Sequence, residues 1–234
     1  MDAVVILRAF FLALAQIGDR RFRKVLLLGI GLTIALLIGA YAGLLWFLDA
    51  IGAEAFLSET LGGVSWVGDL LTWSSLLLMI MLSVFLMVPV ASAITSMFLD
   101  EVAQAVEDRH YPQLPPAEPV PFWDAARDTV NFLGVLIGAN LLALVIYAMI
   151  PPAALFIFWG LNGLLLGREY FTLAAMRRLG RAGAKALRAR HSGTIWLAGT
   201  LMAMPLSIPL VNLVIPILGA ATFTHIFHML QARR

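Results

Sequence analysis

The distribution of charge constrains the fold of this chain more than any other feature. Four long stretches contain no Asp, Glu, Lys or Arg, namely 25–48, 70–99, 129–167 and 191–230. About 20 apolar residues let a helix cross a bilayer, so each stretch is long enough to span one. Charged residues form only 13% of the 234 residues and hydrophobic residues 61%, which leaves too few charges to cover a soluble domain. We therefore predict an all-α integral membrane protein.

The four stretches differ in length and in proline content. Stretch 25–48 predicts one transmembrane helix, and 70–99 predicts a second, which continues as a cytoplasmic helix to residue 111. Proline interrupts the two longer stretches, at Pro151-Pro152 and near Pro205–Pro209. We interpret both as helical hairpins that enter and return on one side, and the sequence leaves open whether their arms cross fully or only in part.

Basic residues predict the orientation, because cytoplasmic segments carry the excess of Lys and Arg. Five basic residues precede residue 25, seven lie in 168–190, and none lies in 49–69. This pattern places both termini and 168–190 in the cytoplasm and 49–69 outside. A single crossing by 129–167 would put the seven basic residues outside, which supports the hairpin interpretation.

We predict a single membrane domain over 1–234. Residues 1–16 are apolar but interrupted by Arg8, so we expect them to lie at the membrane interface as a helix. The segments are an interfacial helix and polar turn at 1–24, a transmembrane helix at 25–48, an external loop at 49–69, a transmembrane helix with its extension at 70–111, a linker at 112–128, a first hairpin at 129–167, a basic amphipathic helix at 168–190 and a second hairpin at 191–230.

The basic helix carries charge at regular spacing. Arg177, Arg181, Lys185 and Arg188 lie at i, i+4, i+8 and i+11, which places them on one helix face. A face of this kind attracts anionic lipid or another anion. The alternative is that these residues only fix the topology.

Few residues offer catalytic or metal chemistry. The chain has no cysteine. His225 and His228 are three residues apart and could ligate a metal from one helix face, but no carboxylate or further histidine lies near them in sequence. We therefore favour interfacial histidines over a metal site, and we predict no metal, no cofactor and no enzymatic activity. No charged residue lies deep in a predicted span, so the usual mark of a proton relay is absent.

A polar turn, residues 16–24, precedes the first span. Gly18 interrupts the chain there, and the N–H groups that open the following helix favour an anion. Arg20 and Arg21 add guanidinium groups, which bind tetrahedral oxyanions through paired hydrogen bonds. The alternative is that both arginines only anchor the chain to lipid phosphates.

Three groups of residues together resemble one known family. They are Gly18, Arg20, Arg21 and Phe22 before the first span, Ala103 with Val106-Glu107 after the second, and Ile208-Pro209-Leu210-Val211-Asn212-Leu213 with Pro216 and Gly219-Ala220-Ala221-Thr222 in the last hairpin. The pattern resembles the CysZ sulfate permeases of the etoposide-induced membrane protein superfamily. The resemblance implies two long helices with two partly penetrating hairpins, sulfate uptake across a bacterial inner membrane for cysteine biosynthesis, and dimers or larger homo-oligomers.

The resemblance also implies that sulfate binds at Gly18, Asp19, Arg20 and Arg21. Asp19 stands where the family has an apolar residue, and its carboxylate would repel a dianion unless it turns away or pairs with an arginine. The leading interpretation is a permease for sulfate or a similar oxyanion, with anionic lipid as a further partner and no nucleic acid. The alternative is a non-transporting membrane organiser or scaffold that binds anionic lipid or a protein partner.

Overall fold

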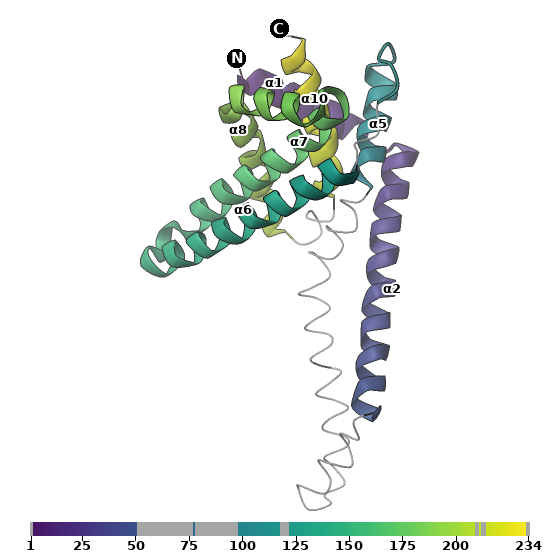
Figure 1. Ribbon diagram of the computed structural model, residues 1–234, viewed down its shortest axis with the longest axis vertical. Helices are drawn as coiled ribbons and strands as arrows, with labels where there is room; N and C mark the ends of the chain where they lie inside the picture. Colours follow the sequence, from purple (N-terminus) through teal and green to yellow (C-terminus); the bar gives the residue numbers. More distant parts are fainter. Residues whose placement is uncertain are drawn as a thin grey trace, which may run out of the picture. The chain divides into compact units, whose positions relative to one another are not determined.

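The computed structural model describes residues 2–50, 77, 98–117, 122–208, 211 and 214–232. Almost all of the external loop predicted at 49–69 and of the span predicted at 70–99 lies outside the described residues. The chain divides into two compact units, one formed by 1–26 with 96–234 and the other by 27–95. Every element in the described ranges is helical, which confirms the all-α fold class (Figure 1).

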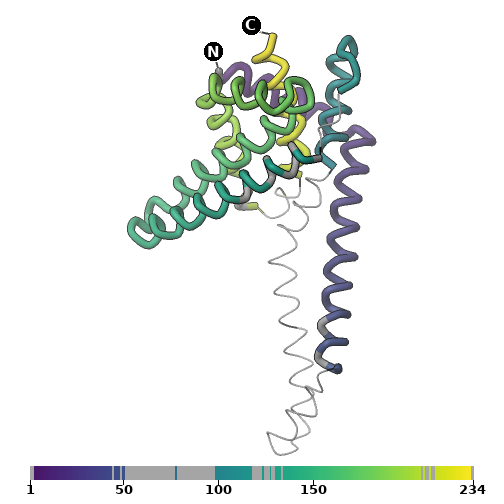
Figure 2. Tube along the Cα trace, in the orientation of Figure 1, coloured from purple at the N-terminus to yellow at the C-terminus, as the bar shows by residue number. Residues whose placement is uncertain are grey.

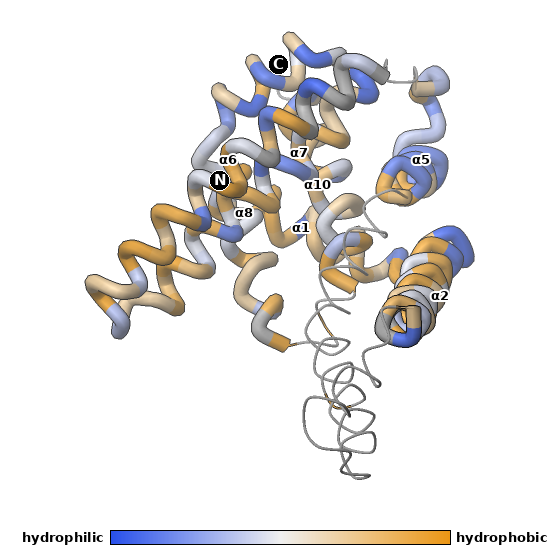
Figure 3. The backbone as a smooth tube through the Cα atoms, turned by 60° about the horizontal axis from the view of Figure 1, so that its bottom comes forward, coloured by the Kyte–Doolittle hydropathy of each residue, from blue (hydrophilic) through white to orange (hydrophobic). Residues whose placement is uncertain are grey.

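Seven α-helices and two 3₁₀ turns are described. They are α1 (Asp2–Ala15), α2 (Arg20–Ala50), α5 (Leu99–His110), α6 (Phe122–Met149), η1 (Pro151–Ala153), α7 (Ala154–Arg190), α8 (Ser192–Ala203), η2 (Met204–Ser207) and α10 (Ile215–Gln231). Two stretches, Arg20–Phe47 in α2 and Val130–Met149 in α6, are long and apolar enough to cross a membrane by length and composition. Figure 3 shows the contrast between the hydrophobic α6 and the more hydrophilic α5.

Proline separates the helices at the two predicted places. Helix α6 ends at Met149, η1 begins at Pro151, and α7 then returns alongside α6, as the tube in Figure 2 shows. Helix α8 ends at Ala203, and η2 carries Pro205 within it. Both breaks fall where proline removes a backbone donor and clashes with the preceding turn.

Helix α7 differs from the sequence-based expectation. We expected a hairpin arm that ends at Gly167 and a separate basic helix at 168–190, but α7 runs without a break through Gly167 and consists of two helical segments that meet at a kink at Gly180. Its one irregularity is Gly180, with φ 64° and ψ −179°, a backbone conformation that glycine adopts readily. The break therefore lies inside the predicted basic helix and not in front of it.

Small residues let α7 and α8 pack closely. A Cβ atom on Gly199 would overlap the carbonyl oxygen of Gly163, and one on Gly167 would lie 2.6 Å from the carbonyl oxygen of Ile195. The glycines of α7 therefore allow the two backbones to approach, and they do not end the helix.

Helix α10 forms the centre of its unit. Its residues are buried from Ile215 to His228, because α1, α5 and α7 all pack against it. A helix that is apolar on every side is stable only when it is covered on every side. The core gathers Phe223, Phe227 and Ile226 of α10 with Phe171 of α7 and Val106 of α5.

Candidate functional site

The polar turn between α1 and α2 is short and regular. The Gln16 N–H donates to the Ala13 carbonyl oxygen at 3.1 Å, and the Asp19 N–H donates to the Gln16 carbonyl oxygen at 2.9 Å. Gly18 does not adopt a positive φ, and nothing lies within 4 Å of a Cβ atom built on it. The turn therefore does not depend on the backbone freedom of Gly18, contrary to the sequence-based argument.

Asp19 caps the N-terminus of α2. Its carbonyl oxygen accepts the Arg23 N–H at 3.0 Å, and its Oδ1 accepts the Arg21 N–H at 2.8 Å. This is the geometry of an N-cap residue, which satisfies an amide that the helix itself leaves free. The Arg21 backbone hydrogen bond is the main reason that the pKa of Asp19 lies below its ordinary value. An ionised carboxylate of the chain thus occupies part of the predicted anion site.

Arg21 is paired with an acid from α5. Its Nη1 lies 2.6 Å from Asp108 Oδ2, and the two side chains are 53% and 47% exposed. Gln104 donates to the other carboxylate oxygen of Asp108 at 2.7 Å. Arg20 is exposed, and Phe22 is buried. Both arginines of the pair are therefore exposed, and Arg21 has a carboxylate partner.

Gln16 connects the turn to α5. Its Nε2 donates to the Ala105 carbonyl oxygen at 3.0 Å and to Asp19 Oδ2 at 3.1 Å. Both partners accept hydrogen bonds, so the orientation of the Gln16 amide is defined. Its Oε1 is buried and has no hydrogen-bond partner among the residues that the structure describes. The turn therefore holds one unused acceptor next to the Asp19 carboxylate.

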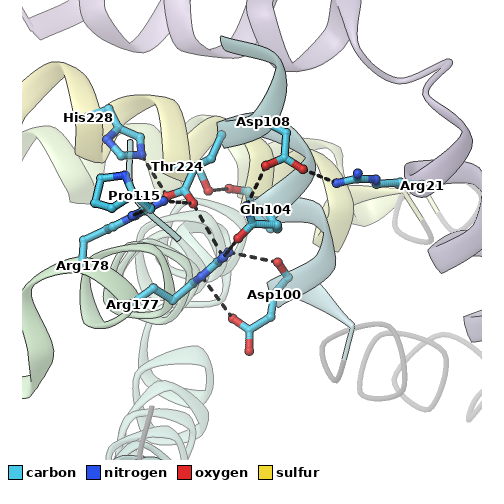
Figure 4. Close-up of polar contacts among 11 residues, drawn as sticks. Arg21, Asp100, Gln104, Asp108, Pro115, Arg177, Arg178, Thr224 and His228 are labelled. Atoms are coloured by element: carbon cyan, nitrogen blue, oxygen red, sulfur yellow. Dashed lines mark hydrogen bonds and ion pairs between the residues drawn. The ribbon is translucent and has the colours of Figure 1, made fainter. Parts of the chain in front are cut away.

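A cluster of buried charges lies where α5, α7 and α10 meet (Figure 4). Arg178 binds Glu107 through two hydrogen bonds, from Nε to Oε1 at 3.0 Å and from Nη2 to Oε2 at 2.6 Å. His228 Nε2 lies 3.0 Å from Glu107 Oε1, and Arg177 Nη2 lies 3.6 Å from Oε2. Arg178 Nη1 also donates to the Pro115 carbonyl oxygen. We call Glu107, Arg177, Arg178 and His228 the buried charge cluster.

Glu107 is ionised in this environment. Burial alone would raise its pKa, but the hydrogen bonds from His228 and Arg178 and the charges of Arg177 and Arg178 outweigh burial and lower the pKa to about 2. The side chain of Glu107 is only 3% exposed. A carboxylate at such depth is stable only when it is paired and hydrogen-bonded, as it is here.

His225 and His228 are buried inside the protein. His225 Nδ1 lies 3.0 Å from Tyr111 Oη, and the His225 ring packs against His110 with centroids 4.8 Å apart. Glu107, the carboxylate next to His228, is 121 residues away along the chain, so their proximity is not evident from the sequence. Across the described residues, no group of three or more His, Cys, Asp or Glu side chains has the arrangement of a metal site.

The predicted basic face is divided by the structure. Arg177 is buried, and it donates to the Asp100 carbonyl oxygen at 2.9 Å and to Gln104 Oε1 at 2.6 Å. Arg188 donates to Thr172 at 2.7 Å, whereas Lys185 is exposed. Arg181 is half-buried and also has a partner. The kink at Gly180 separates Arg177 from the three later residues, so the expectation of one exposed face is wrong for Arg177.

The arrangement defines a class of protein: an all-helical membrane protein with an arginine pair at the start of an apolar helix. The family model described as Sulfate transporter CysZ/Etoposide-induced protein 2.4 matches residues 9–216. The chain belongs to this family, which confirms the resemblance seen in the sequence. The match includes Gly18–Arg21 and Glu107, and it ends before His228. No curated protein and no solved structure gave a significant match.

Proposed function

We propose that this chain is a permease of the bacterial inner membrane that moves sulfate or a similar tetrahedral oxyanion and so supports cysteine biosynthesis. Membership in the sulfate transporter family supports the transport class. The observation that carries the proposal is the exposed arginine pair, Arg20 and Arg21, at the N-terminus of the apolar helix α2.

The chemistry of this turn suits an oxyanion. A helix N-terminus carries a partial positive charge, and guanidinium groups present several N–H donors in one plane. Arg21 uses its Nη1 for Asp108, and this pair is exposed, so an anion in solution can compete for it. Exposed pairs contribute only about 0–1 kcal/mol, so their exchange for a ligand requires little free energy.

The remaining helices fit a protein that is embedded in lipid. Helix α1 exposes Val4, Leu7 and Phe11 and buries Val5 and Ala9 against the core. This division supports an interfacial helix with one face toward lipid. We propose that α6 with α7 and α8 with α10 enter the membrane as two hairpins, with both termini in the cytoplasm, and that the chain assembles into homo-oligomers.

Uptake by proteoliposomes tests the proposal. Purified protein is reconstituted, and the entry of radiolabelled sulfate and phosphate is measured, with chloride as a control anion. We expect uptake of at least one oxyanion by the parent and a large loss in the Arg20→Ala and Arg21→Ala variants. Arg127→Ala, which removes an arginine from another helix, serves as the matched control.

The alternative function is a non-transporting organiser that binds anionic lipid. One observation favours it: Asp108 pairs with the Arg21 guanidinium and the Asp19 carboxylate accepts the Arg21 N–H, so carboxylates of the chain already occupy partners in the turn. In that case the liposomes take up no oxyanion at any concentration, while binding of the protein to anionic vesicles remains strong.

A further inference from the structure

We infer that His110 and His225 form a two-histidine site for a late first-row divalent metal ion such as Zn²⁺, where the end of α5 packs against α10. The ion binds the Nε2 atoms of both rings and so joins the two helices. Tyr111 is a positioning residue, because it holds the other nitrogen of His225. The inference goes beyond the proposed function, since none of these residues lies in the turn before α2.

Both histidines have a nitrogen that the chain leaves unused. His225 is fully buried, and His110 is half-buried at the last position of α5. The Nε2 atom of each ring is buried and has no hydrogen-bond partner among the described residues. A buried polar atom without a partner is unfavourable, and an ion or an ordered water is a common reason for one. Imidazole nitrogen is the commonest side-chain ligand of metals, so two unused nitrogens in touching rings point to a shared ion.

The spacing of the two rings fits one ion between them. The ring centroids of His110 and His225 lie 4.8 Å apart, and the ring planes meet at 74°. Zn–N bonds are about 2.0–2.1 Å long, so two imidazoles that share an ion at a tetrahedral angle have centroids about 5 Å apart. The observed separation is close to this value, so both rings reach one ion with little rearrangement.

Tyr111 gives His225 the orientation that a metal ligand needs. The Tyr111 Oη lies 3.0 Å from His225 Nδ1, the ring nitrogen other than Nε2. When Nδ1–H donates to the Tyr111 oxygen, Nε2 keeps its lone pair for a metal. Metal-bound histidines almost always donate their second nitrogen to a neighbouring group in this way.

The structure changes the pair of histidines that the sequence brought together. His225 and His228 are three residues apart, but His228 Nε2 lies 3.0 Å from Glu107 Oε1 and is already engaged. His110 of α5 takes the place of His228 beside His225. The described residues offer no third His, Cys, Asp or Glu ligand at this point, so water fills the remaining positions on the ion.

The surroundings of His110 determine which ions bind. Burial, and to a lesser extent the charge of Arg109, lower the pKa of His110, so its ring is neutral at pH 7, as metal binding requires. Two neutral imidazoles beside an arginine suit ions that bond strongly to nitrogen, namely Zn²⁺, Ni²⁺ and Cu²⁺. Mg²⁺ and Ca²⁺ prefer several oxygen ligands and should not bind.

Zinc titration of the untagged full chain in detergent tests the inference. Calorimetry should show one Zn²⁺ per chain, and the melting temperature should rise with Zn²⁺ and return to its starting value with EDTA, because a ligand of the folded state stabilises it. Mg²⁺ and Ca²⁺ should leave the melting temperature unchanged. Co²⁺ in place of Zn²⁺ adds a visible absorption spectrum that reports nitrogen coordination directly.

Three variants assign the ligands. His110→Gln and His225→Gln each remove one imidazole, so each should lose the stoichiometric binding and the Co²⁺ spectrum. Tyr111→Phe keeps both ligands and should weaken the binding of Zn²⁺ about 10- to 100-fold. His191→Gln removes a histidine between α7 and α8 and is the matched control, which should bind Zn²⁺ as the parent does. Circular dichroism without metal shows whether each variant is folded.

The decisive result comes from His110→Gln, because His110 is half-buried at a helix end and its loss leaves the core around His225 in place. Absence of stoichiometric Zn²⁺ binding in the parent, or binding that persists in folded His110→Gln, would overturn the inference. Unchanged affinity in Tyr111→Phe would overturn the positioning role of Tyr111.

Discussion

Two regions of this molecule contain arginine–carboxylate pairs, and they differ mainly in depth. In the buried charge cluster, the side chains of Arg178 and Glu107 are 9% and 3% exposed. At the turn before α2, those of Arg21 and Asp108 are 53% and 47% exposed, although the shortest contact is 2.6 Å in both pairs. Equal distances therefore do not mean equal strength or an equal role.

Depth decides what each pair can do. Breaking a buried pair leaves an uncompensated charge, which costs about 3–5 kcal/mol. Exposed pairs contribute about 0–1 kcal/mol, because water and salt screen the charges. We therefore assign a structural role to the buried charge cluster, where it joins α5, α7 and α10. We propose that the turn exchanges its partner for an anion from solution.

The largest expected effect is on stability. Glu107→Gln keeps the shape of the side chain and removes its charge, so Arg177 and Arg178 lose their buried counterion. We expect a loss of about 3–5 kcal/mol in the free energy of unfolding. Asp108→Asn is the exposed counterpart and should change stability by about 1 kcal/mol or less. Denaturant unfolding in detergent, followed by circular dichroism, measures both; similar losses would remove the distinction between the two regions.

The second effect concerns acid. The pKa of Glu107 in the folded protein, about 2, lies below its ordinary value of 4.5. Ionised Glu107 therefore stabilises the folded protein fully above pH 4.5. This stabilisation, on the order of 3 kcal/mol, is lost as the pH falls toward 2. Unfolding midpoints measured between pH 6 and 2.5 should fall steeply in the parent. A curve of equal slope in Glu107→Gln would assign the acid sensitivity to another group.

The third effect concerns the anion itself. Arg20→Ala and Arg21→Ala each remove a charged hydrogen-bond donor, so each should weaken oxyanion binding by about 1.5–3 kcal/mol. This corresponds to roughly a 10- to 150-fold rise in Kd. Lysine should restore only part of the affinity, because it lacks the planar fork of donors. Calorimetry with the preferred anion gives the Kd values, and complete rescue by lysine would argue against a guanidinium-specific site.

The smallest expected effect is on the binding of vesicles, and it concerns the exposed charge on α7. Lys185 is exposed, whereas Arg177 is buried. Lys185→Gln should weaken binding to anionic vesicles by about 1 kcal/mol. The variant should bind neutral vesicles as the parent does. Cosedimentation measures both, and equal binding of parent and variant to anionic vesicles would leave only a topological role for this charge.

Local sequence signals predicted the all-helical fold and the helix breaks at proline. The prolines at 151, 152 and 205 mark breaks because proline acts on its own turn of helix. The continuity of α7 through Gly167 was not predictable, because it depends on the approach of α8. The arginine pair at the start of α2 was also visible in the sequence, because a helix start and its charges are adjacent there.

The sequence did not show which residues pair with the charged side chains. Arg21 meets Asp108 across 87 residues, and Glu107 meets His228 across 121. Such pairs are set by helix packing, and spacing along the chain carries no information about them. A signal for the buried charge cluster did exist in Glu107, which the resemblance singled out without a role. The capping role of Asp19 could have been predicted from the sequence, because Asp before a helix is a common N-cap.

The central claim is that the anion binds at the turn before α2 and that the buried charge cluster only supports the fold. Melting temperature against phosphate concentration tests both parts in one measurement, because a ligand that binds only the folded state stabilises it by about 2.7 kcal/mol at one hundred times its Kd. We predict that phosphate raises the melting temperature of the parent and of Glu107→Gln, which starts lower, but not that of Arg21→Ala. An undiminished rise in Arg21→Ala, or its loss in a folded Glu107→Gln, would contradict the account.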